Sequence, residues 1–470
     1  MPLNAGEAGY GSVPGLGLSG SVGASEAAPL LIPETEPVQH WRPLKKEELE
    51  AAAGGKGWRR VRCYLVLLFW LSWVAMLATS IAIVATSPRP VVTPLRWWQK
   101  TLFYQLQPHL LMEEQAEGSG GINALCEQLP YLRSLGIGAM ILEGPFDKEA
   151  SPSNLTGTGE SSGTLARIQH LLAESSKAGL KVVLDFCELD LAGSAEEPAN
   201  LSASHALRFW LEQGVAGFAI CDTDAAYSEK TLLEWRGVFK EFSSQEEERI
   251  LVVKQMRDVP PPPLNNVTLV DVIMRSILPP SLHLLSDKEV ADAIETHLQT
   301  REDDIWPSWT VVGKASHNVK KLLLVLIMTL PGSPAVQYDE DIGQTQATES
   351  SSVALFSSLS HSRAREEALL YGSFTFLPFN SSSNSTHASP SSPPVLAFLR
   401  SWGCVHFLIL LNVGPEPRAL DPAWAPSLPE AGVFVTSTGM DRLGSMTLGA
   451  LELRPHEAVV IKLFEAGSYS

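Results

Sequence analysis

The feature that most constrains this chain is a run of 23 residues without a charged side chain, "CYLVLLFWLSWVAMLATSIAIVA", from Cys63 to Ala85. As a helix it would be about 34 Å long, which is enough to cross the hydrocarbon core of a bilayer. A core helix of a soluble domain would be shorter and would show a polar face, and a cleaved signal peptide would lie nearer the N-terminus. The run therefore predicts a transmembrane helix over residues 63–85.

Charges and glycosylation signals lie unevenly on the two sides of this run. Four basic residues crowd its N-terminal side, at Lys56, Arg59, Arg60 and Arg62. The C-terminal side has only three within reach, at Arg89, Arg96 and Lys100. The positive-inside rule then places the N-terminus in the cytosol. Five Asn-x-Ser/Thr sequons, the acceptors of N-linked glycans, all follow the run, at Asn154, Asn200, Asn266, Asn380 and Asn384. We therefore expect a single-pass type II membrane glycoprotein with an extracellular C-terminal part.

The acidity of the chain is confined to this C-terminal part. Residues 1–62 hold seven basic and seven acidic residues, so the remaining 28 basic and 45 acidic residues carry the whole net charge of −17. A domain of this charge repels the phosphate backbone, and we expect no nucleic-acid partner.

The segments around the predicted span differ in composition. Residues 1–42 are rich in Gly, Ser, Ala and Pro, which is typical of a disordered tail, here on the cytosolic side. Residues 43–62 form a cytosolic juxtamembrane segment, and residues 86–100 form a proline-containing neck.

Two different patterns follow the neck. Over residues 101–368, short apolar runs such as "TLFYQL", "KVVLDF" and "GVAGFAI" alternate with helical stretches that often end at Gly, and eight such alternations predict a parallel (β/α)8 TIM barrel. Over residues 369–470 strands come alone, as in "VHFLILLNVG" and "AVVIKLF", which predicts an antiparallel β-sandwich domain. The expected fold class is therefore α/β, with a transmembrane helix, a barrel and a C-terminal β domain.

The predicted span also offers a surface for another helix. Small side chains recur at helical spacing and form one face, at Ser72, Ala75, Thr79 and Ala82. Such a face lets a second transmembrane helix approach closely. Trp70 and Trp73 would pack either on lipid or on a partner, and the sequence does not decide between these two.

Several motifs resemble the α-amylase family of glycoside hydrolases: "LPYLRSLGIGAMILEGPF" (129–146), "KVVLDF" (181–186) and "LPGSPAVQYDEDIG" (330–343). The resemblance implies a carboxylate nucleophile and a carboxylic general acid about 5 Å apart at the ends of barrel strands. In "GVAGFAICD" the nucleophile position is Cys221, and the position of its orienting arginine is Ala219. The acid position after the fifth strand is Gln255. Asp185 alone is retained, and it reads as a structural carboxylate.

Other departures from the family agree with a missing active site. The Asn-His-Asp expected at the seventh strand is absent from "WPSWTVVGKASHN", and the stretch after the third strand is too short for the domain that active members insert there. The alternative, in which Cys221 is a new nucleophile, needs a base, and no His is placed on a neighbouring strand end. We expect no hydrolysis, no cofactor and no metal.

Cys187 and Cys221 end adjacent predicted strands with the same parity, so both should face the barrel interior. In an oxidising compartment they either pair in a disulfide or remain two buried thiols.

A narrower resemblance covers the chain from about residue 43 onward. "LKKEEL", "GGKGW", "LLFWLSWVAMLA" and "RWWQ" occur in this order and resemble the 4F2-type heavy chains of heteromeric amino-acid transporters. This implies a non-catalytic subunit that stabilises a multi-pass light chain and delivers it to the plasma membrane. The alternatives are an adhesion or signalling receptor that acts as an integrin cofactor and, least favoured, a membrane-anchored α-glucosidase.

One departure from these heavy chains concerns their link to the light chain. They carry a cysteine a few residues outside the membrane, and alignment on Trp97-Trp98 places Arg89 there. Cys63 lies at the cytosolic end of the span, in a reducing compartment. The remaining cysteines, Cys126, Cys187, Cys221 and Cys404, are expected within the barrel or the C-terminal domain. We therefore predict a non-covalent association.

Overall fold

The computed structural model describes residues 45–86, 94–106, 121–144, 162–187, 199–222, 226, 228–244, 247–255, 269–281, 283–299, 305–337, 351–377, 395–420 and 428–464. The chain divides into two compact units, residues 1–88 and 89–470, and each is described by itself.

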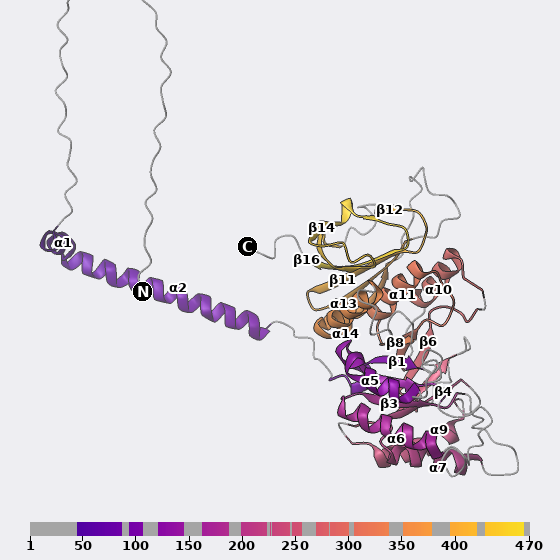
Figure 1. The fold of residues 1–470 in the computed structure, drawn as a ribbon. Helices are drawn as coiled ribbons and strands as arrows, with labels where there is room; N and C mark the ends of the chain where they lie inside the picture. The colour runs from indigo at the N-terminus through magenta and orange to yellow at the C-terminus, as the bar shows by residue number, and fades with distance from the viewer. Residues whose placement is uncertain are drawn as a thin grey trace, which may run out of the picture. The chain divides into compact units, whose positions relative to one another are not determined.

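The first unit consists of the short helix α1 (Lys46–Ala53) and the long helix α2 (Lys56–Thr86), which contains the expected span (Figure 1). Within the described residues, α2 is the one helix long and apolar enough to cross a membrane, over Gly57–Ile83 with a mean hydropathy of 2.1. Its polar side chains bond within the helix: the Ser72 hydroxyl donates to the Phe69 carbonyl at 2.9 Å and the Thr79 hydroxyl to the Met76 carbonyl at 2.9 Å. Hydroxyls satisfied in this way are compatible with an apolar surrounding.

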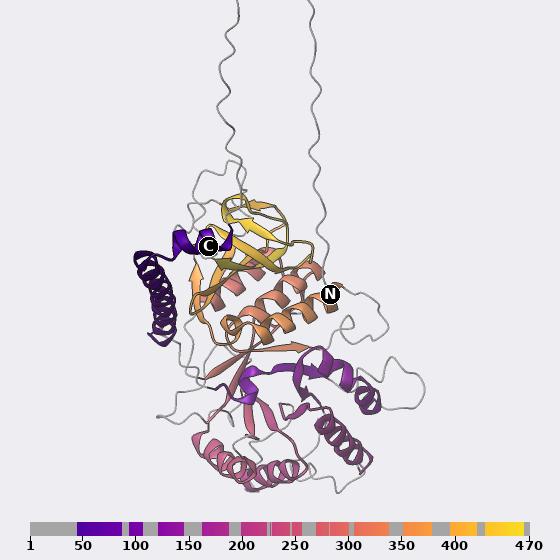
Figure 2. The same cartoon turned by 90° about the vertical axis from the view of Figure 1, so that its left-hand side faces the viewer.

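The second unit begins with a closed parallel barrel, which confirms the expected fold class (Figures 1 and 2). Its strands pair in chain order, and β1 closes on β8. The strands are β1 (Leu102–Leu106), β2 (Ile137–Leu142), β3 (Lys181–Asp185), β4 (Gly217–Cys221), β5 (Ile250–Gln255), β6 (Val272–Ser276), β7 (Trp306–Thr310) and β8 (Ser333–Gln337).

Helices surround the barrel: α5 (Gly121–Ser134), α6 (Ser162–Lys177), α7 (Ala199–Glu212), α9 (Glu229–Phe242), α10 (Asp287–Gln299), α11 (His317–Thr329), α13 (Ser351–Arg365) and α14 (Glu367–Leu370). Ser228 and Ser316 cap the N-termini of α9 and α11 through their side-chain oxygens. Gly179 and Gly214, at φ +74° and +93°, follow the ends of α6 and α7, as the sequence predicts.

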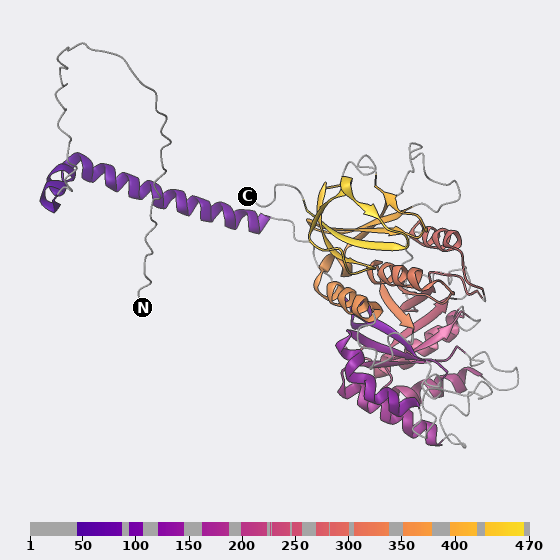
Figure 3. The ribbon, with the colours of Figure 1, turned by 45° about the horizontal axis from the view of Figure 1, so that its top comes forward.

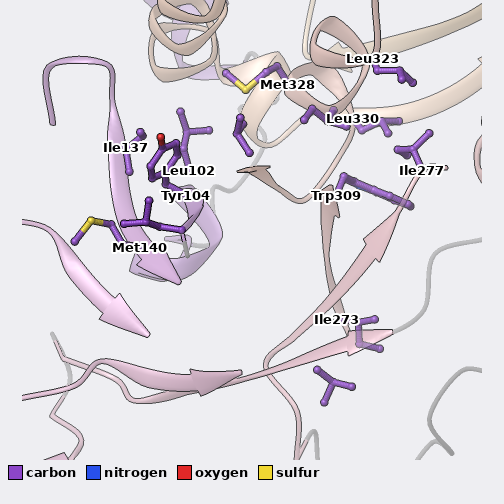
Figure 4. Packing of buried hydrophobic residues seen from close by; sticks show 14 of the residues in the cluster. Leu102, Tyr104, Ile137, Met140, Ile273, Ile277, Trp309, Leu323, Met328 and Leu330 are labelled. Carbon is purple, nitrogen blue, oxygen red and sulfur yellow. The ribbon is translucent and has the colours of Figure 1, made fainter. Parts of the chain in front are cut away.

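Each barrel strand is buried on both sides, as parallel sheets require. Inward-facing side chains form an apolar cluster, namely Phe103, Ala139, Ile141, Val183, Ala219, Ile250, Val252, Val272, Met274 and Ala335. Alternate side chains face outward against the helices. Figure 4 shows Leu102 and Tyr104 of β1 beside Ile137 and Met140 of β2 in this outer layer.

A short helix, α3 (Trp97–Lys100), closes the barrel end at which the strands begin. Trp98 packs into the inner cluster and stacks edge-on against Trp306, the first residue of β7. The indole nitrogen of Trp97 donates to the Glu248 carbonyl oxygen at 2.9 Å, and that of Trp98 donates to the Glu248 carboxylate at 3.3 Å. The Ser333 hydroxyl donates to the Trp98 carbonyl at 2.9 Å. The last four residues of the predicted neck, 97–100, therefore pack as part of the barrel.

The C-terminal part is an antiparallel sheet in the order β14–β13–β16–β11–β10–β9, with a separate two-stranded ribbon, β12 and β15. The strands are β9 (Ser373–Leu377), β10 (Leu396–Trp402), β11 (Val405–Asn412), β12 (Arg418–Ala419), β13 (Ala431–Ser437), β14 (Ser445–Thr447), β15 (Glu452–Leu453) and β16 (Glu457–Phe464). One face, with Phe398 and Ile409, joins the outer core of the barrel. The other face, with Ala397 and Leu410, packs against Leu453 of the ribbon. Figure 3 shows this sheet in orange and yellow beside the helices of the barrel.

Two buried arginines bond to the end of α11, and one of them, Arg400, joins the barrel to this sheet. Arg363 of α13 donates to the carbonyl oxygens of Met328 and Leu330 at 3.0 and 3.3 Å. Arg400 of β10 donates to the Thr329 carbonyl at 3.0 Å. These carbonyls end α11, where cations favourably meet the negative end of the helix dipole. The compact unit 89–470 contains both parts, and the division expected at residue 369 stays a prediction.

Candidate functional site

The end of the barrel at which the strands finish carries a ring of polar side chains. They occupy the last inward-facing positions, and all but Thr310 lie two residues beyond an apolar inner residue: Gln105 on β1, Glu143 after β2, Asp185 on β3, Cys221 on β4, Lys254 on β5 and Thr310 on β7. In α/β barrels this end carries the functional residues, because the loops after the strands meet there. It is therefore the candidate site.

An ion triad dominates the ring. The ammonium of Lys254 forms ion pairs with the carboxylates of Asp185 and Glu143, and the side chains of Lys254 and Asp185 are only 11% and 6% exposed. Burial alone would lower the pKa of Lys254, but the two carboxylates outweigh it, so its pKa lies above the usual range. Burial raises the pKa of Asp185 despite the ammonium beside it. One cation is thus shared between two carboxylates.

Gln105 extends the triad across the barrel. Its amide nitrogen donates to Glu143 Oε1 at 3.3 Å and contacts the Met274 sulfur at 3.1 Å, while its carbonyl oxygen accepts from the Thr310 hydroxyl at 2.9 Å. Side chains from β1, β3, β5 and β7 therefore belong to one polar network, which satisfies groups that would be costly to bury alone.

A disulfide joins Cys187 to Cys221, with Cα atoms 4.7 Å apart. The sequence left open whether these residues pair or remain thiols, and in the structure they are paired. The backbone N–H of Cys187 also donates to Asp185 Oδ1 at 2.8 Å, so the disulfide borders the ion triad. The sulfur at the expected nucleophile position is therefore held in a covalent bond.

The acid position expected at Gln255 needs correction. Gln255 has the parity of Leu251 and Val253, which belong to the outer core, and its side-chain oxygen accepts from Arg275 Nε at 2.7 Å. The inward-facing residue at the end of β5 is Lys254, which pairs in register with Cys221. The chemically relevant position on β5 thus carries an ammonium, one residue before the expected amide.

The other predicted site residues are not members of this ring. Ser72, Ala75, Thr79 and Ala82 are exposed on α2, as are Trp70 and Trp73. Asn200 lies in the first turn of α7, whereas Asn154, Asn266, Asn380 and Asn384 fall outside the described residues. Cys63 and Cys404 are exposed, and Cys126 of α5 is half-buried with its sulfur 3.6 Å from His170 Nδ1.

This arrangement sets limits on the chemistry at the barrel end. A retaining glycosidase needs one ionised and one protonated carboxyl group facing the sugar. Here Asp185 and Glu143 both face Lys254, and Cys221 is oxidised. Within the described ranges, no cluster of His, Cys, Asp and Glu is suited to hold a metal ion.

Sequence reasoning missed Lys254 and Glu143. A signal for the first was present, because a lysine at the end of the apolar run "RILVVK" requires a buried partner.

The closed barrel followed by an antiparallel sheet is the fold of the α-amylase-type glycoside hydrolases. Isomaltulose synthase from Klebsiella sp. LX3 superposes with a TM-score of 0.57, covering 79% of this chain and 100% of that structure, at 13% sequence identity. An identity this low shows the fold alone.

Sequence comparison leads to a particular group of proteins. The family model "Solute carrier family 3 member 2 N-terminus" matches residues 32–104. The chain is 28% identical over 497 aligned positions to the amino acid transporter heavy chain SLC3A2 of Oryctolagus cuniculus, covering 91% of this chain and 89% of that protein. The mouse protein of the same name is 27% identical over 498 positions, with 91% and 90% covered. The chain is therefore a relative of the amino acid transporter heavy chains, and the resemblance predicted from its sequence is confirmed.

Proposed function

We propose that this chain is the non-catalytic heavy-chain subunit of a heteromeric amino-acid transporter, which stabilises a multi-pass light chain and delivers it to the plasma membrane. The observation that carries the proposal is the sequence similarity to amino acid transporter heavy chains over 91% of the chain. This similarity does not depend on the comparison of folds. The long apolar helix α2 supports it, because a subunit of this kind must be held beside its partner in the membrane.

The contents of the barrel end support a non-catalytic role. The nucleophile position lies in a disulfide, and Lys254 stands beside it, where the family resemblance requires an acid. Both remaining carboxylates form ion pairs with that lysine. We expect the purified chain to hydrolyse a maltose-type substrate no faster than its Asp185→Ala variant. Turnover well above that variant would favour the α-glucosidase alternative.

The proposed topology is type II, with the N-terminus in the cytosol and the barrel outside the cell. Basic residues crowd the cytosolic side of α2, and all five sequons follow it. The light chain would approach the small-residue face formed by Ser72, Ala75, Thr79 and Ala82. The association would be non-covalent, because the neck has no cysteine.

Co-purification tests the proposal. The full chain, expressed in cells and extracted in mild detergent, should bring down a multi-pass amino-acid transporter that separates from it in denaturing detergent without reductant. Peptide-N-glycosidase should raise the mobility of the chain on the same gel. Capture of an integrin with no transporter would favour the receptor alternative, and a heterodimer band that collapses only with dithiothreitol would show a covalent link.

A further inference from the structure

The predicted membrane helix carries its tryptophans at two very different depths. Trp58 lies next to Arg59 and Arg60, at the level where tryptophan usually meets the headgroups. Trp70 and Trp73 lie eight and eleven residues beyond Arg62, the last charge before the span. At 1.5 Å per residue, Trp73 is about 16 Å into a hydrocarbon core about 30 Å thick, near its middle.

An indole at this depth carries an N–H donor that needs a hydrogen-bond acceptor. The side chains of Trp70 and Trp73 are 57% and 49% exposed on α2, and their rings contact each other edge to face with centroids 6.0 Å apart. Within the described part of the chain, neither indole nitrogen has a hydrogen-bond acceptor, in contrast to Trp97 and Trp98 at the barrel. The bilayer core offers no water, so an unpaired N–H there costs free energy.

The two indoles also define a face of their own. At 100° per residue, Trp70 and Trp73 lie roughly 100–180° around α2 from each member of the small-residue face. A helix that packs on the small-residue face therefore cannot reach the two indoles. A partner that meets both faces must offer more than one transmembrane element, which is what a multi-pass protein does.

Lipid does not supply the acceptor at this depth. The hydroxyl of a sterol and the ester carbonyls of a phospholipid lie at the membrane interface, about half a bilayer core away from Trp73. Below that level lipid offers only hydrocarbon. A neighbouring transmembrane helix can present a Ser, Thr or Asn oxygen, or a carbonyl freed at a kink, at any depth.

We propose that Trp70 and Trp73 form a docking face for a transmembrane helix of the partner, and that this helix presents an oxygen acceptor to the Trp73 indole N–H near the bilayer middle. The inference rests on the proposed function, since it takes the partner to be the multi-pass transporter. It names the chemistry of the contact and adds a second side of α2 to the interface.

The test uses the full chain with the amino-acid transporter that co-precipitates with it, both tagged for energy transfer in cell membranes. Trp73→Phe keeps an aromatic ring and removes the N–H, so it should lower the association constant about 3- to 15-fold, the range of hydrogen bonds between membrane helices. Trp73→Leu should lower it to a similar degree, because the donor and not the ring is decisive. Trp58→Phe is the matched control, and it should leave association unchanged.

The outcomes separate the inference from the proposed function. If the unaltered chain captures no amino-acid transporter, the proposed function fails and the inference with it. If it captures one and Trp73→Phe associates equally well, the inference alone is wrong. A loss seen with Trp73→Leu but not with Trp73→Phe would overturn the donor role in favour of packing. Cholesterol extraction gives a last outcome. If it weakens the association of the unaltered chain as much as Trp73→Phe does, and has no added effect on that variant, the face binds sterol and the inference is wrong.

Discussion

The two ends of the barrel are closed in different ways. Where the strands begin, the aromatic plug formed by Trp97 and Trp98 packs on the inner cluster, and its indole donors bond to Glu248. Where the strands finish, the closure consists of the Lys254 ion triad and the Cys187–Cys221 disulfide. One end is built from apolar surface, the other from buried charge and a covalent bond.

The contrast shows which end folding alone can explain. Replacing a buried ion network by apolar residues of similar volume is often neutral or stabilising, so closing a barrel does not require charges. The aromatic plug closes its end of the barrel with apolar side chains and so avoids the free-energy cost of burying charges. Charges occur here at the end where α/β barrels hold their reacting groups, but they are paired with one another. This end is as polar as an active site, but its polar groups pair with each other.

The largest effect is expected from breaking the triad. Lys254→Met should lower the free energy of unfolding of residues 89–470 by about 5 kcal/mol, since it leaves two buried carboxylates without their cation. Urea denaturation measures the change, with Lys288→Met, at an exposed lysine of α10, as the control. Adding Asp185→Asn and Glu143→Gln to Lys254→Met should recover part of the loss. A loss below 1 kcal/mol would mean that water reaches the triad and that this end is open.

The corresponding change at the other end should be somewhat smaller. Trp98→Ala removes a side chain that is 5% exposed and leaves a cavity among apolar neighbours, with an expected loss of about 4 kcal/mol. The same denaturation series measures it, and Trp402→Ala, at a half-buried tryptophan of β10, gives the comparison. Equal losses for the two variants would show that the plug contributes no more than a half-buried aromatic residue.

The disulfide should contribute less again, and only at the triad end. Its residues are 34 apart in the chain, and closing a loop of that size stabilises a fold by about 3.8 kcal/mol through the unfolded state. Replacing Cys187 and Cys221 together by Ser should lower the unfolding free energy by this amount. Dithiothreitol should lower the stability of the unaltered chain and leave the double variant unaffected. Sensitivity of the double variant to reductant would point to another bridge.

The smallest expected effect is a difference in the pH at which the lysines at the two ends lose their protons. Lys181, whose ammonium lies 4.9 Å from the ring centre of Trp97, has its pKa lowered, chiefly by burial, while that of Lys254 is raised by its carboxylates. The folded chain therefore sheds the Lys181 proton before the unfolded chain does, and the cost of burying this charge falls as the pH rises toward about 10.4. The stabilisation from Lys254 is complete below about pH 10.4 and is lost only as the pH rises through its raised folded pKa.

Amine labelling followed by mass spectrometry checks this order. The labelling rate of Lys181 should reach its half-maximum at a lower pH than that of Lys254. The midpoint of each curve, and not its height, is compared, because access differs between the two lysines. Coincident midpoints would contradict the contrast between the two ends.

Much of the fold was predictable because its signals are local. The alternation of apolar runs with helical stretches predicted the barrel, and the glycines at 179 and 214 marked the helix ends. The helix α13 has the weaker local signal, since its serine-rich stretch shows little apolar periodicity and is stabilised by Leu355, Phe356 and Leu359 packing on the core. Tertiary contact, rather than helix propensity, decides the structure of this segment.

The candidate site was less predictable for a related reason. β5 is buried on both faces, so its apolar run shows no alternation from which inward and outward positions can be read. The register with β4 fixes Lys254 inward and Gln255 outward, and that register exists only in the closed barrel. The partners of Lys254 are 69 and 111 residues away in the chain, which is beyond any sequence spacing rule.

The shared ammonium has a further consequence, for the routes by which this sequence can change. An acid placed at Lys254 in one step would leave Asp185 and Glu143 in buried contact with a third carboxyl group and without the cation that they share. An acid placed at Cys221 first would leave the Cys187 thiol unpaired and add a negative charge at the end of the strand next to Asp185. Each single substitution toward a hydrolytic pair thus gives a fold less stable than the present one. Neutral drift can alter the surroundings of this barrel end. The stability of the ion triad and the disulfide opposes single-residue changes toward a hydrolytic site.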